Sequence, residues 1–459
     1  MVRLTRRAVL QTSFAATAAA AFGWRAITQE VQPPIIFVHG DGDDAEIWYT
    51  VLWRFESNGY DPRRLIAIDF PNPGTGRPGN YGQPHPGRST TGEQLIELAA
   101  RVEEVRRSIS QDKVVLVAHS RGGNAVRNYI KNGGGHATVT AAVLCACPNH
   151  GTYASRAPEF RLGETNGWGH FLRQLNEGPT EATPGVRFLT IRSDRNDRWF
   201  QPALPPDHPV AGGRTGVPSN AVYDSPELTG ATNLVLPGAD HKEAARSPRA
   251  FEAMYRFILE REPAHLDILP EARPILDGKV TGLVGNLPTN LPLEGAEVEI
   301  FAVSPDTGER LGGAAHRRVT GADGRWGPFE ADPAAYHEFV LAAPGYPVEH
   351  IYRPPFPRSS TVLRLRPRGF AQDSDAQAPG AVITVVRCNG NLARDRDNVL
   401  VDGQVPSGLP GSPPQRNETT LRLDAQDRRP VPVAVNGEHL TVQTWPARDN
   451  HVVVAEVHY

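Results

Sequence analysis

The stretch that most constrains this chain runs from Val114 to Gly123 and reads VVLVAHSRGG. Its first four residues are apolar and mostly β-branched, which predicts a buried strand. Ser120 follows among small residues, and Asn124 to Ile130 continues as a predicted helix. A serine at the tip of a sharp strand-turn-helix connection is typical of a nucleophile elbow. The alternative is a serine in an ordinary loop, because short motifs also match by chance.

The residues two before and two after the serine favour the elbow. They are Ala118 and Gly122, so the pattern G-x-S-x-G reads A-H-S-R-G here. The tight turn brings neighbouring chain very close and accepts only small side chains at these positions. Alanine is a mild departure, since its methyl group is the smallest side chain after hydrogen.

Strands alternate with helices on both sides of this elbow. An amphipathic helix that begins after Thr90 or Thr91 leads directly into the elbow strand. The alternation predicts βαβ units and an α/β fold with a mostly parallel sheet. A short apolar segment, Trp168 to Leu172, predicts either a lid or a packed surface helix. The other predicted strands are 35–38, 65–70, 138–147, 186–191 and 231–236, and further helices are predicted at 46–57 and 248–259.

A serine nucleophile needs a base within hydrogen-bond reach and an acid that orients this base. In a fold with this elbow, the acid and then the histidine follow the serine along the chain. His241 follows the last strand of the alternating region and is the predicted base. Asp194 and Asp197 both follow the strand 186–191. We favour Asp197, because the loop needs several residues before a carboxylate can reach back to the histidine.

Two backbone N–H groups are expected to stabilise the oxyanion of the tetrahedral intermediate. One belongs to Arg121, directly after the serine, and the other to Asp41 in the loop after the strand 35–38. Gly40 and Gly42 allow this loop to approach a substrate. The mechanism needs no cofactor.

Composition excludes several other classes of protein. The net charge is −3 with mixed signs, and no stripe of basic residues is present, which argues against a nucleic-acid partner. The three cysteines have no zinc-ligand spacing. Cys145 and Cys147 alternate along one predicted strand, so both are expected on the same face as buried residues. Asp43 and Asp44 read as loop and helix-start charges, with a metal site as the disfavoured alternative.

The pattern changes after a proline-marked linker that runs from Glu262 to Pro274. Short alternating strands with turns between them predict an all-β region, either a sandwich or a barrel. We divide it at the linker 366–380 into 275–366 and 380–459, and the sequence leaves open whether the two fold as one domain. Residues 27–262 form the predicted catalytic domain.

The first 26 residues predict a targeting segment. Arg6 and Arg7 precede an alanine-rich segment that is too short to span a bilayer. This pattern is similar to a twin-arginine export signal, which implies the twin-arginine machinery as a partner and a periplasmic or secreted protein. An ordinary secretory signal, or a start site placed too early, is the alternative.

Three motifs together resemble bacterial lipases of the α/β-hydrolase superfamily over residues 33–260. They are His39-Gly40-Asp41-Gly42, Ala118-His119-Ser120-Arg121-Gly122 and Cys147-Pro148-Asn149-His150-Gly151-Thr152. The resemblance implies that the last motif lines the substrate pocket, so His150 is a pocket residue and not the base. His39 and His119 are assigned to the same pocket. The run from Ile36 to Asp43 also resembles an extracellular polyhydroxybutyrate depolymerase group.

The β-rich region has a resemblance of its own. Residues 292–298, 321–326 and 343–346 are similar to the carboxypeptidase-regulatory, transthyretin-like β-sandwich, a module that is not itself catalytic. A lipase domain followed by a β region also resembles archaeal and bacterial long-chain lipases.

These observations predict an exported serine hydrolase that cleaves carboxylic esters, most simply lipids, and that contacts a lipid or polymer surface. A polyester depolymerase is the alternative enzyme. A catalytically inert binding or adhesion protein is the alternative of another class. Because every predicted catalytic residue precedes Glu262, the β region is expected to be separable from the chemistry. The opposing possibility is that it covers an apolar face of the catalytic domain.

Overall fold

The computed structural model describes residues 32–76, 86–208, 210–370, 372–424 and 428–458. The predicted export signal at residues 1–26 lies outside them. From Pro33 onward the chain forms one compact unit. Within the described residues, no helix combines the length and the apolar character needed to cross a membrane.

A six-stranded sheet forms the centre of the N-terminal half, and all of its strand pairs are parallel. Parallel strands covered on both faces are apolar almost throughout, as the fully buried strand β5 illustrates. The α/β fold class predicted from the sequence is therefore confirmed. In spatial order the strands are β2 (Leu65–Ile68), β1 (Ile35–Val38), β5 (Val114–His119), β6 (Val139–Cys145), β7 (Arg187–Ser193) and β8 (Thr232–Leu236).

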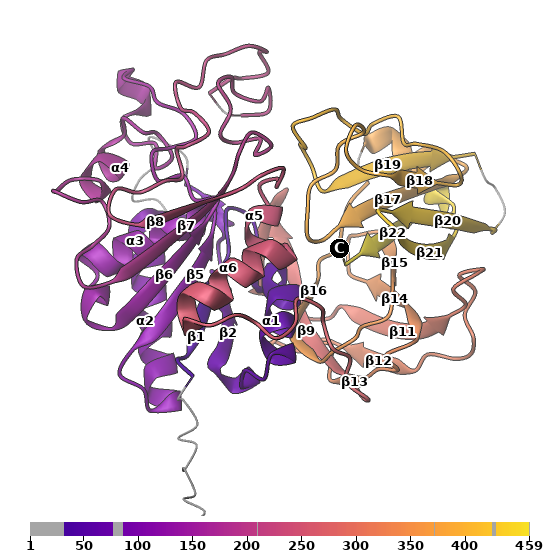
Figure 1. The fold of residues 1–459 in the computed structure, drawn as a ribbon. Helices are drawn as coiled ribbons and strands as arrows, with labels where there is room; N and C mark the ends of the chain where they lie inside the picture. Colours follow the sequence, from indigo (N-terminus) through magenta and orange to yellow (C-terminus); the bar gives the residue numbers. More distant parts are fainter. Residues whose placement is uncertain (1–31, 77–85, 209, 371, 425–427, 459) are drawn as a thin grey trace, which may run out of the picture. The chain divides into compact units, whose positions relative to one another are not determined.

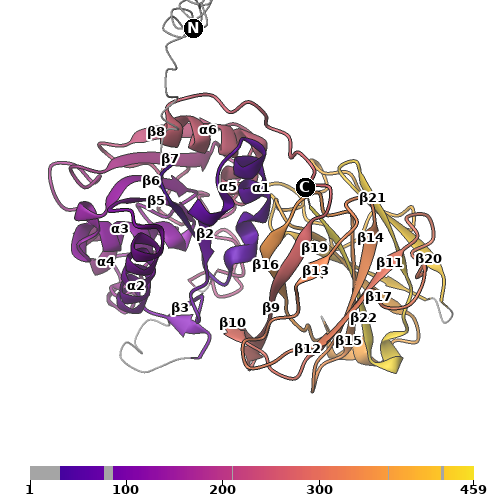
Figure 2. The ribbon, with the colours of Figure 1, turned by 90° about the horizontal axis from the view of Figure 1, so that it is seen from below.

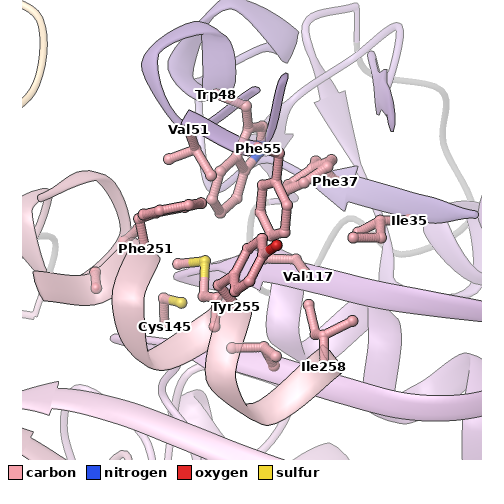
Figure 3. Close-up of a cluster of buried hydrophobic side chains, with 14 of the residues drawn as sticks. Ile35, Phe37, Trp48, Val51, Phe55, Val117, Cys145, Phe251, Tyr255 and Ile258 are labelled. Carbon is pink, nitrogen blue, oxygen red and sulfur yellow. The ribbon is translucent and has the colours of Figure 1, made fainter. Parts of the chain in front are cut away.

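Helices cover both faces of this sheet (Figure 1). Alternate residues of each strand point to opposite faces, so Ile35 and Phe37 join one core cluster while Ile36 and Val38 join the other. The first cluster packs against α1 (Tyr49–Ser57) and α6 (Pro248–Leu259), as Figure 3 shows for Phe55, Phe251 and Tyr255. The second cluster packs against α2 (Thr91–Ile109) and α3 (Arg121–Asn132) on the opposite side (Figure 2). Two short α-helices remain within the described residues, α4 (His170–Leu175) and α5 (Glu243–Arg246).

The two cysteines at the end of β6 do not share a face. Cys145 belongs to the cluster under α1 and α6, whereas Cys147 belongs to the cluster under α2 and α3. Ala146 between them has a φ of 49°, which interrupts the two-residue period of the strand. The prediction that both thiols lie on one face is therefore wrong.

The C-terminal half is all-β, as predicted, and its largest sheet draws on both predicted β segments. In the middle of this seven-stranded sheet, β15 (Val348–Arg353) of the first segment pairs in parallel with β22 (His451–Val457) of the second. Strands of the segments 275–366 and 380–459 therefore share one sheet, and the division between these segments stays a prediction. The full order is β12 (His316–Val319), β11 (Glu297–Val303), β14 (Tyr336–Ala342), β15, β22, β17 (Ala381–Arg387) and β19 (Glu418–Leu423).

Two smaller sheets complete the β region. The first has the order β10 (Leu287–Pro292), β9 (Ile275–Val284) and β13 (Phe329–Glu330), and β16 (Ser360–Leu365) also pairs with β9. The second consists of β18 (Val399–Val401), β20 (Pro430–Val435) and β21 (Glu438–Gln443).

The sequence analysis missed β10, β13, β15 and β20. Two of these strands, β10 and β20, contain prolines, which argue against a strand in the sequence. Proline cannot donate a hydrogen bond to a neighbouring strand, so it occurs only at positions where no such bond is needed. Strand β10 lies at a sheet edge, and Pro430 and Pro432 of β20 lie beyond the stretch that pairs with β18. Between the predicted strand 65–70 and the helix that follows Thr90, the structure also contains the two-residue strands β3 (Gly74–Thr75) and β4 (Arg88–Ser89).

Helix α1 is buried from two sides. Phe55 faces the parallel sheet, while Tyr49 and Trp53 lie in a core cluster with Leu276 and Phe356 of the β region. The indole N–H of Trp53 donates to the carbonyl of Ser359 at 2.7 Å. The β region therefore covers an apolar face of the catalytic half.

Candidate active site

Ser120 lies between β5 and α3 in a backbone conformation that non-glycine residues rarely adopt. Its φ is 51° and its ψ is −129°. The conformation depends on close approach, because a Cβ added at Gly122 would clash with the carbonyl oxygen of His39. A Cβ added at Gly40 would lie 2.9 Å from the Cβ of Ser120. The turn thus has the strained, tightly packed geometry expected of an elbow.

The loops after β7 and β8 bring an acid and a histidine together. His241 Nδ1 lies 2.7 Å from Asp197 Oδ2, and both side chains are buried. The other carboxylate oxygen of Asp197 accepts the backbone N–H of Trp199 at 2.9 Å. Asp197 therefore has both oxygens engaged, one of them by the imidazole.

Asp194 makes different contacts. Its Oδ1 accepts the backbone N–H groups of Arg195 at 2.6 Å and of Gly238 at 3.1 Å. These bonds tie the loop after β7 to the loop after β8. Asp194 therefore supports the two loops on which Asp197 and His241 lie.

The loop after β1 carries His39 and Asp41. His39 is buried, and burial lowers its pKa, so the ring is neutral at neutral pH. Its Nδ1–H donates to the Gly40 carbonyl at 2.8 Å, and its Nε2 accepts the backbone N–H of Phe70 at 3.0 Å. The side chain of Asp41 is exposed and accepts the Thr75 hydroxyl at 2.5 Å.

Arg121 is the first residue of α3, where backbone N–H groups have no partner within the helix. The N–H that the sequence assigns to the oxyanion is therefore not used by the helix itself. Its side chain is buried and forms an ion pair with Glu164, with Nη2 and Oε2 2.9 Å apart. The same guanidinium donates to the carbonyl oxygens of Pro73 and Ser89. The sequence analysis missed Glu164, which lies in a stretch without strand or motif signal.

Comparisons with known proteins identify the family of this chain. A family model described as "Alpha/beta hydrolase family" matches residues 35–276, more than half of the 459-residue chain. The chain belongs to the alpha/beta hydrolase family. A second model, "Lipase C-terminal domain", matches residues 275–369 of this hydrolase. No curated protein matches the chain.

Solved structures similar to this hydrolase include lipases. The mature lipase BlEst2 of Bacillus licheniformis is 18% identical over 50% of this chain and 93% of its own, with a TM-score of 0.36. Lipase B of Aspergillus fumigatus is 16% identical over 51% of this chain and 54% of its own, with a TM-score of 0.35. The phospholipase PlaB of Legionella pneumophila is 13% identical over 73% of this chain and 94% of its own, with a TM-score of 0.32. The resemblances to polyhydroxybutyrate depolymerases and to the carboxypeptidase-regulatory module stay predictions.

The other two histidines assigned to the pocket have distinct surroundings in this hydrolase. His119 is buried next to His241, and its Nε2–H donates to the His241 carbonyl at 3.0 Å. Burial lowers the pKa of His119 to about 4, so it is neutral at neutral pH. His150 is half-exposed and pairs with Glu181 at 2.7 Å, which raises the pKa of this histidine.

Aromatic side chains lie around His241, the partner of Asp197. The rings of Trp199 and Phe200 lie 6.4 and 6.2 Å from that of His241, measured between centroids. The predicted lid segment, Trp168 to Leu172, overlaps the first half of α4, whose Leu172 and Leu175 are buried, while Trp168 is exposed under Arg156. An apolar neighbourhood thus adjoins the proposed catalytic histidine.

The carboxylates that the sequence offered as an alternative metal site pair with basic residues. Asp43 Oδ2 lies 3.7 Å from Arg246 Nη2, and Asp44 forms an ion pair with Arg364. Across the described part of the chain, no group of three or more His, Cys, Asp or Glu residues could hold a metal ion.

A charged cavity of about 520 Å³ adjoins this loop. Asp43, Lys242 and Arg246 line it from the catalytic half, and Glu349, Arg353 and Arg366 line it from the β region. Ser120, Asp197 and His241 are not among its lining residues. Burial raises the pKa of Glu349 to about 7, so this carboxyl gains or loses its proton near neutral pH.

Proposed function

We propose that this alpha/beta hydrolase is an exported serine hydrolase that cleaves carboxylic esters, with lipids as the substrate class. The observation that carries the proposal is the 2.7 Å contact between His241 Nδ1 and Asp197 Oδ2, with His241 bonded to His119, the residue before Ser120 in the elbow. A buried carboxylate at Nδ1 fixes the tautomer in which Nε2 is free to act as a base.

In this mechanism Ser120 Oγ attacks the acyl carbon while His241 Nε2 takes the hydroxyl proton. The backbone N–H groups of Arg121 and Asp41 stabilise the oxyanion. His241 then gives the proton to the leaving alcohol, and a water molecule, activated by the same histidine, releases the acyl group. The chemistry uses side chains and backbone alone, with no cofactor.

The substrate class rests on the surroundings of the proposed site. The rings of Trp199, which is half-buried, and of Phe200, which is buried, give His241 an apolar surrounding. This surrounding suits an acyl chain better than a charged substrate. The match of residues 275–369 to a lipase C-terminal domain favours the same class. A polyester is the second candidate, and a series of p-nitrophenyl esters of rising chain length, run beside polyhydroxybutyrate, distinguishes the two.

Export rests on the sequence of residues 1–26 alone. The paired arginines at Arg6 and Arg7 favour the twin-arginine route and a periplasmic or secreted enzyme that meets lipid or polymer surfaces. Replacing both arginines by lysine and following the protein in cell fractions tests this route, since retention in the cytoplasm is the expected result.

The test of the catalytic proposal is Ser120→Ala. Loss of a triad nucleophile costs on the order of a millionfold in turnover, so ester hydrolysis should fall to background. Ser108→Ala is the matched control, because that hydroxyl only donates to the Val105 carbonyl within α2. A fluorophosphonate should label the wild type and Ser108→Ala, and leave Ser120→Ala unlabelled. A wild type that resists the probe would favour the inert binding protein instead.

A further inference from the structure

One residue of the β region reaches into the loops beside the proposed active site. Asn290 lies on β10 and is 4% exposed. Its side-chain NH₂ donates to the carbonyl oxygens of Phe70 at 2.9 Å and of Asp43 at 3.0 Å. Its backbone N–H donates to the Pro71 carbonyl at 2.9 Å. A single residue thus holds both the loop after β1 and the loop after β2.

Two arginines fix the orientation of this amide. Arg364 Nη1 and Arg366 Nη2 each lie 3.0 Å from Asn290 Oδ1. A guanidinium can only donate, so the amide oxygen must face the arginines and the NH₂ must face the loop carbonyls. Arg364 in turn pairs with Asp44, the residue after one of those carbonyls. The amide is therefore locked in the orientation in which it can hold the loops.

The contacts of Asn290 reach both sides of the proposed oxyanion donor, directly at Asp43 and indirectly at His39 through Phe70. Asp41 lies between Gly40 and Gly42, and Gly42 has a φ of 70°. On the N-terminal side, His39 is bonded to Phe70, whose carbonyl Asn290 also holds. On the C-terminal side, Asn290 holds the Asp43 carbonyl directly. The loop also has inner contacts, since the Gly42 N–H donates to the Pro73 carbonyl at 3.2 Å and the Asp41 carboxylate accepts the Thr75 hydroxyl. Because glycines resist conformational change poorly, the direction of the Asp41 N–H depends on these contacts together with those of Asn290.

We infer that Asn290 is a positioning residue through which the β region sets the geometry of the oxyanion loop. The inference rests on the proposed function, because it assigns Asn290 an effect on the stabilisation of the oxyanion. It makes the β region part of the hydrolytic machinery.

The test is Asn290→Asp, which keeps the shape of the side chain. A carboxylate still accepts from Arg364 and Arg366, but it cannot donate to the carbonyls of Phe70 and Asp43. For a short soluble ester, kcat should fall by about 10- to 100-fold, since small misplacements of catalytic groups have effects of this size. KM should stay within about twofold, because ground-state binding does not use the oxyanion.

Trp53→Phe is the control for contact between the two halves. Trp53 lies on α1, outside the oxyanion loop. The substitution removes the hydrogen bond from the indole N–H to the Ser359 carbonyl and keeps an aromatic ring. We expect a lower melting temperature with unchanged kcat. If Asn290→Asp also lowered only the melting temperature, Asn290 would be a docking residue and the inference would be overturned.

A milder variant covers the case in which Asn290→Asp does not give monodisperse protein. Arg366→Gln removes one of the two donors that orient the amide and leaves Asn290 in place. A fall in kcat of severalfold at constant KM supports the inference, and an unchanged kcat overturns it. Ser120→Ala distinguishes a failure of the proposed function from a failure of the inference about Asn290. An active Ser120→Ala protein would contradict the proposed function. An inactive Ser120→Ala protein together with an unaffected Asn290→Asp protein would contradict only the positioning role.

Discussion

His241 Nδ1 lies 2.7 Å from Asp197 Oδ2, although the two residues are 44 positions apart in the chain. Asp194 is three residues before Asp197 in the same loop, yet its carboxylate holds the backbone of Gly238. The loop after β7 therefore presents one carboxylate to the imidazole and uses the other to fix the neighbouring loop.

This difference predicts unequal effects for two equivalent substitutions. Asp197→Asn should lower kcat by about four orders of magnitude, because loss of the orienting carboxylate leaves the histidine in the wrong tautomer. Asp194→Asn keeps an oxygen that can accept from Gly238, so kcat should change by less than about tenfold. Steady-state kinetics with a soluble p-nitrophenyl ester measure both, and the reverse ranking would move the acid role to Asp194.

The parts of the structure that could be predicted are those with a local pattern. The elbow, the parallel sheet and the alternation of strands with helices follow from apolar runs and small residues, and the structure has them at nearly the predicted positions. Asp197 was favoured over Asp194 on loop length alone, and the observed contact with His241 agrees with that argument.

Other features depend on contacts between distant segments and leave no local signal. Strand β10 has a proline near its start and another at its end, so its sequence LPTNLP does not read as a strand, and the contacts of Asn290 could not be foreseen. Glu164 reaches Arg121 across 43 residues from a stretch without regular pattern. The error over Cys145 and Cys147 arose from one backbone angle, that of Ala146, which is not a glycine.

The buried ion pair between Arg121 and Glu164 should be important for stability. Glu164→Ala would leave a buried guanidinium without its carboxylate, which typically costs about 3–5 kcal/mol. Glu104→Ala removes one partner of an exposed pair with Arg101 and should cost at most about 1 kcal/mol. Urea unfolding gives both values, and equal costs would mean that the Arg121 side chain is satisfied without Glu164.

The raised pKa of Glu349 predicts a pH-dependent stability. Its folded-state pKa of about 7 exceeds its ordinary value of 4.5, so the folded protein holds this proton more tightly than the unfolded chain. The stability from this proton is complete below about pH 4.5 and is lost as the pH rises through 7. Glu349→Gln removes this effect. The free energy of unfolding of the variant minus that of wild type should therefore be up to about 3 kcal/mol larger at pH 8 than at pH 4.5, which means that the variant is relatively more stable at pH 8.

Urea unfolding at the two pH values measures that difference. Glu104→Gln removes an exposed carboxylate on α2 and controls for the loss of one negative charge. A relative stability of Glu349→Gln that is the same at both pH values would contradict the assignment.

The last prediction concerns a protein that ends at Glu262. The sequence alone suggested that such a fragment keeps its activity on short esters, because the proposed catalytic residues all precede the linker. The structure favours the opposite outcome, since Tyr49 and Trp53 of α1 pack against Leu276 and Phe356 of the β region. Each large side chain gains about 1.5–3 kcal/mol from burial, so the fragment should aggregate through the exposed face of α1.

Polar substitutions on that face separate the two effects of truncation. In the fragment, Tyr49→Ser with Trp53→Gln should restore monodisperse protein in size-exclusion chromatography. Its kcat on a short ester should still lie below that of the full chain, because the contacts of Asn290 to Phe70 and Asp43 are missing. An unsubstituted fragment that is monodisperse and unfolds cooperatively would show that the β region is not needed to cover α1.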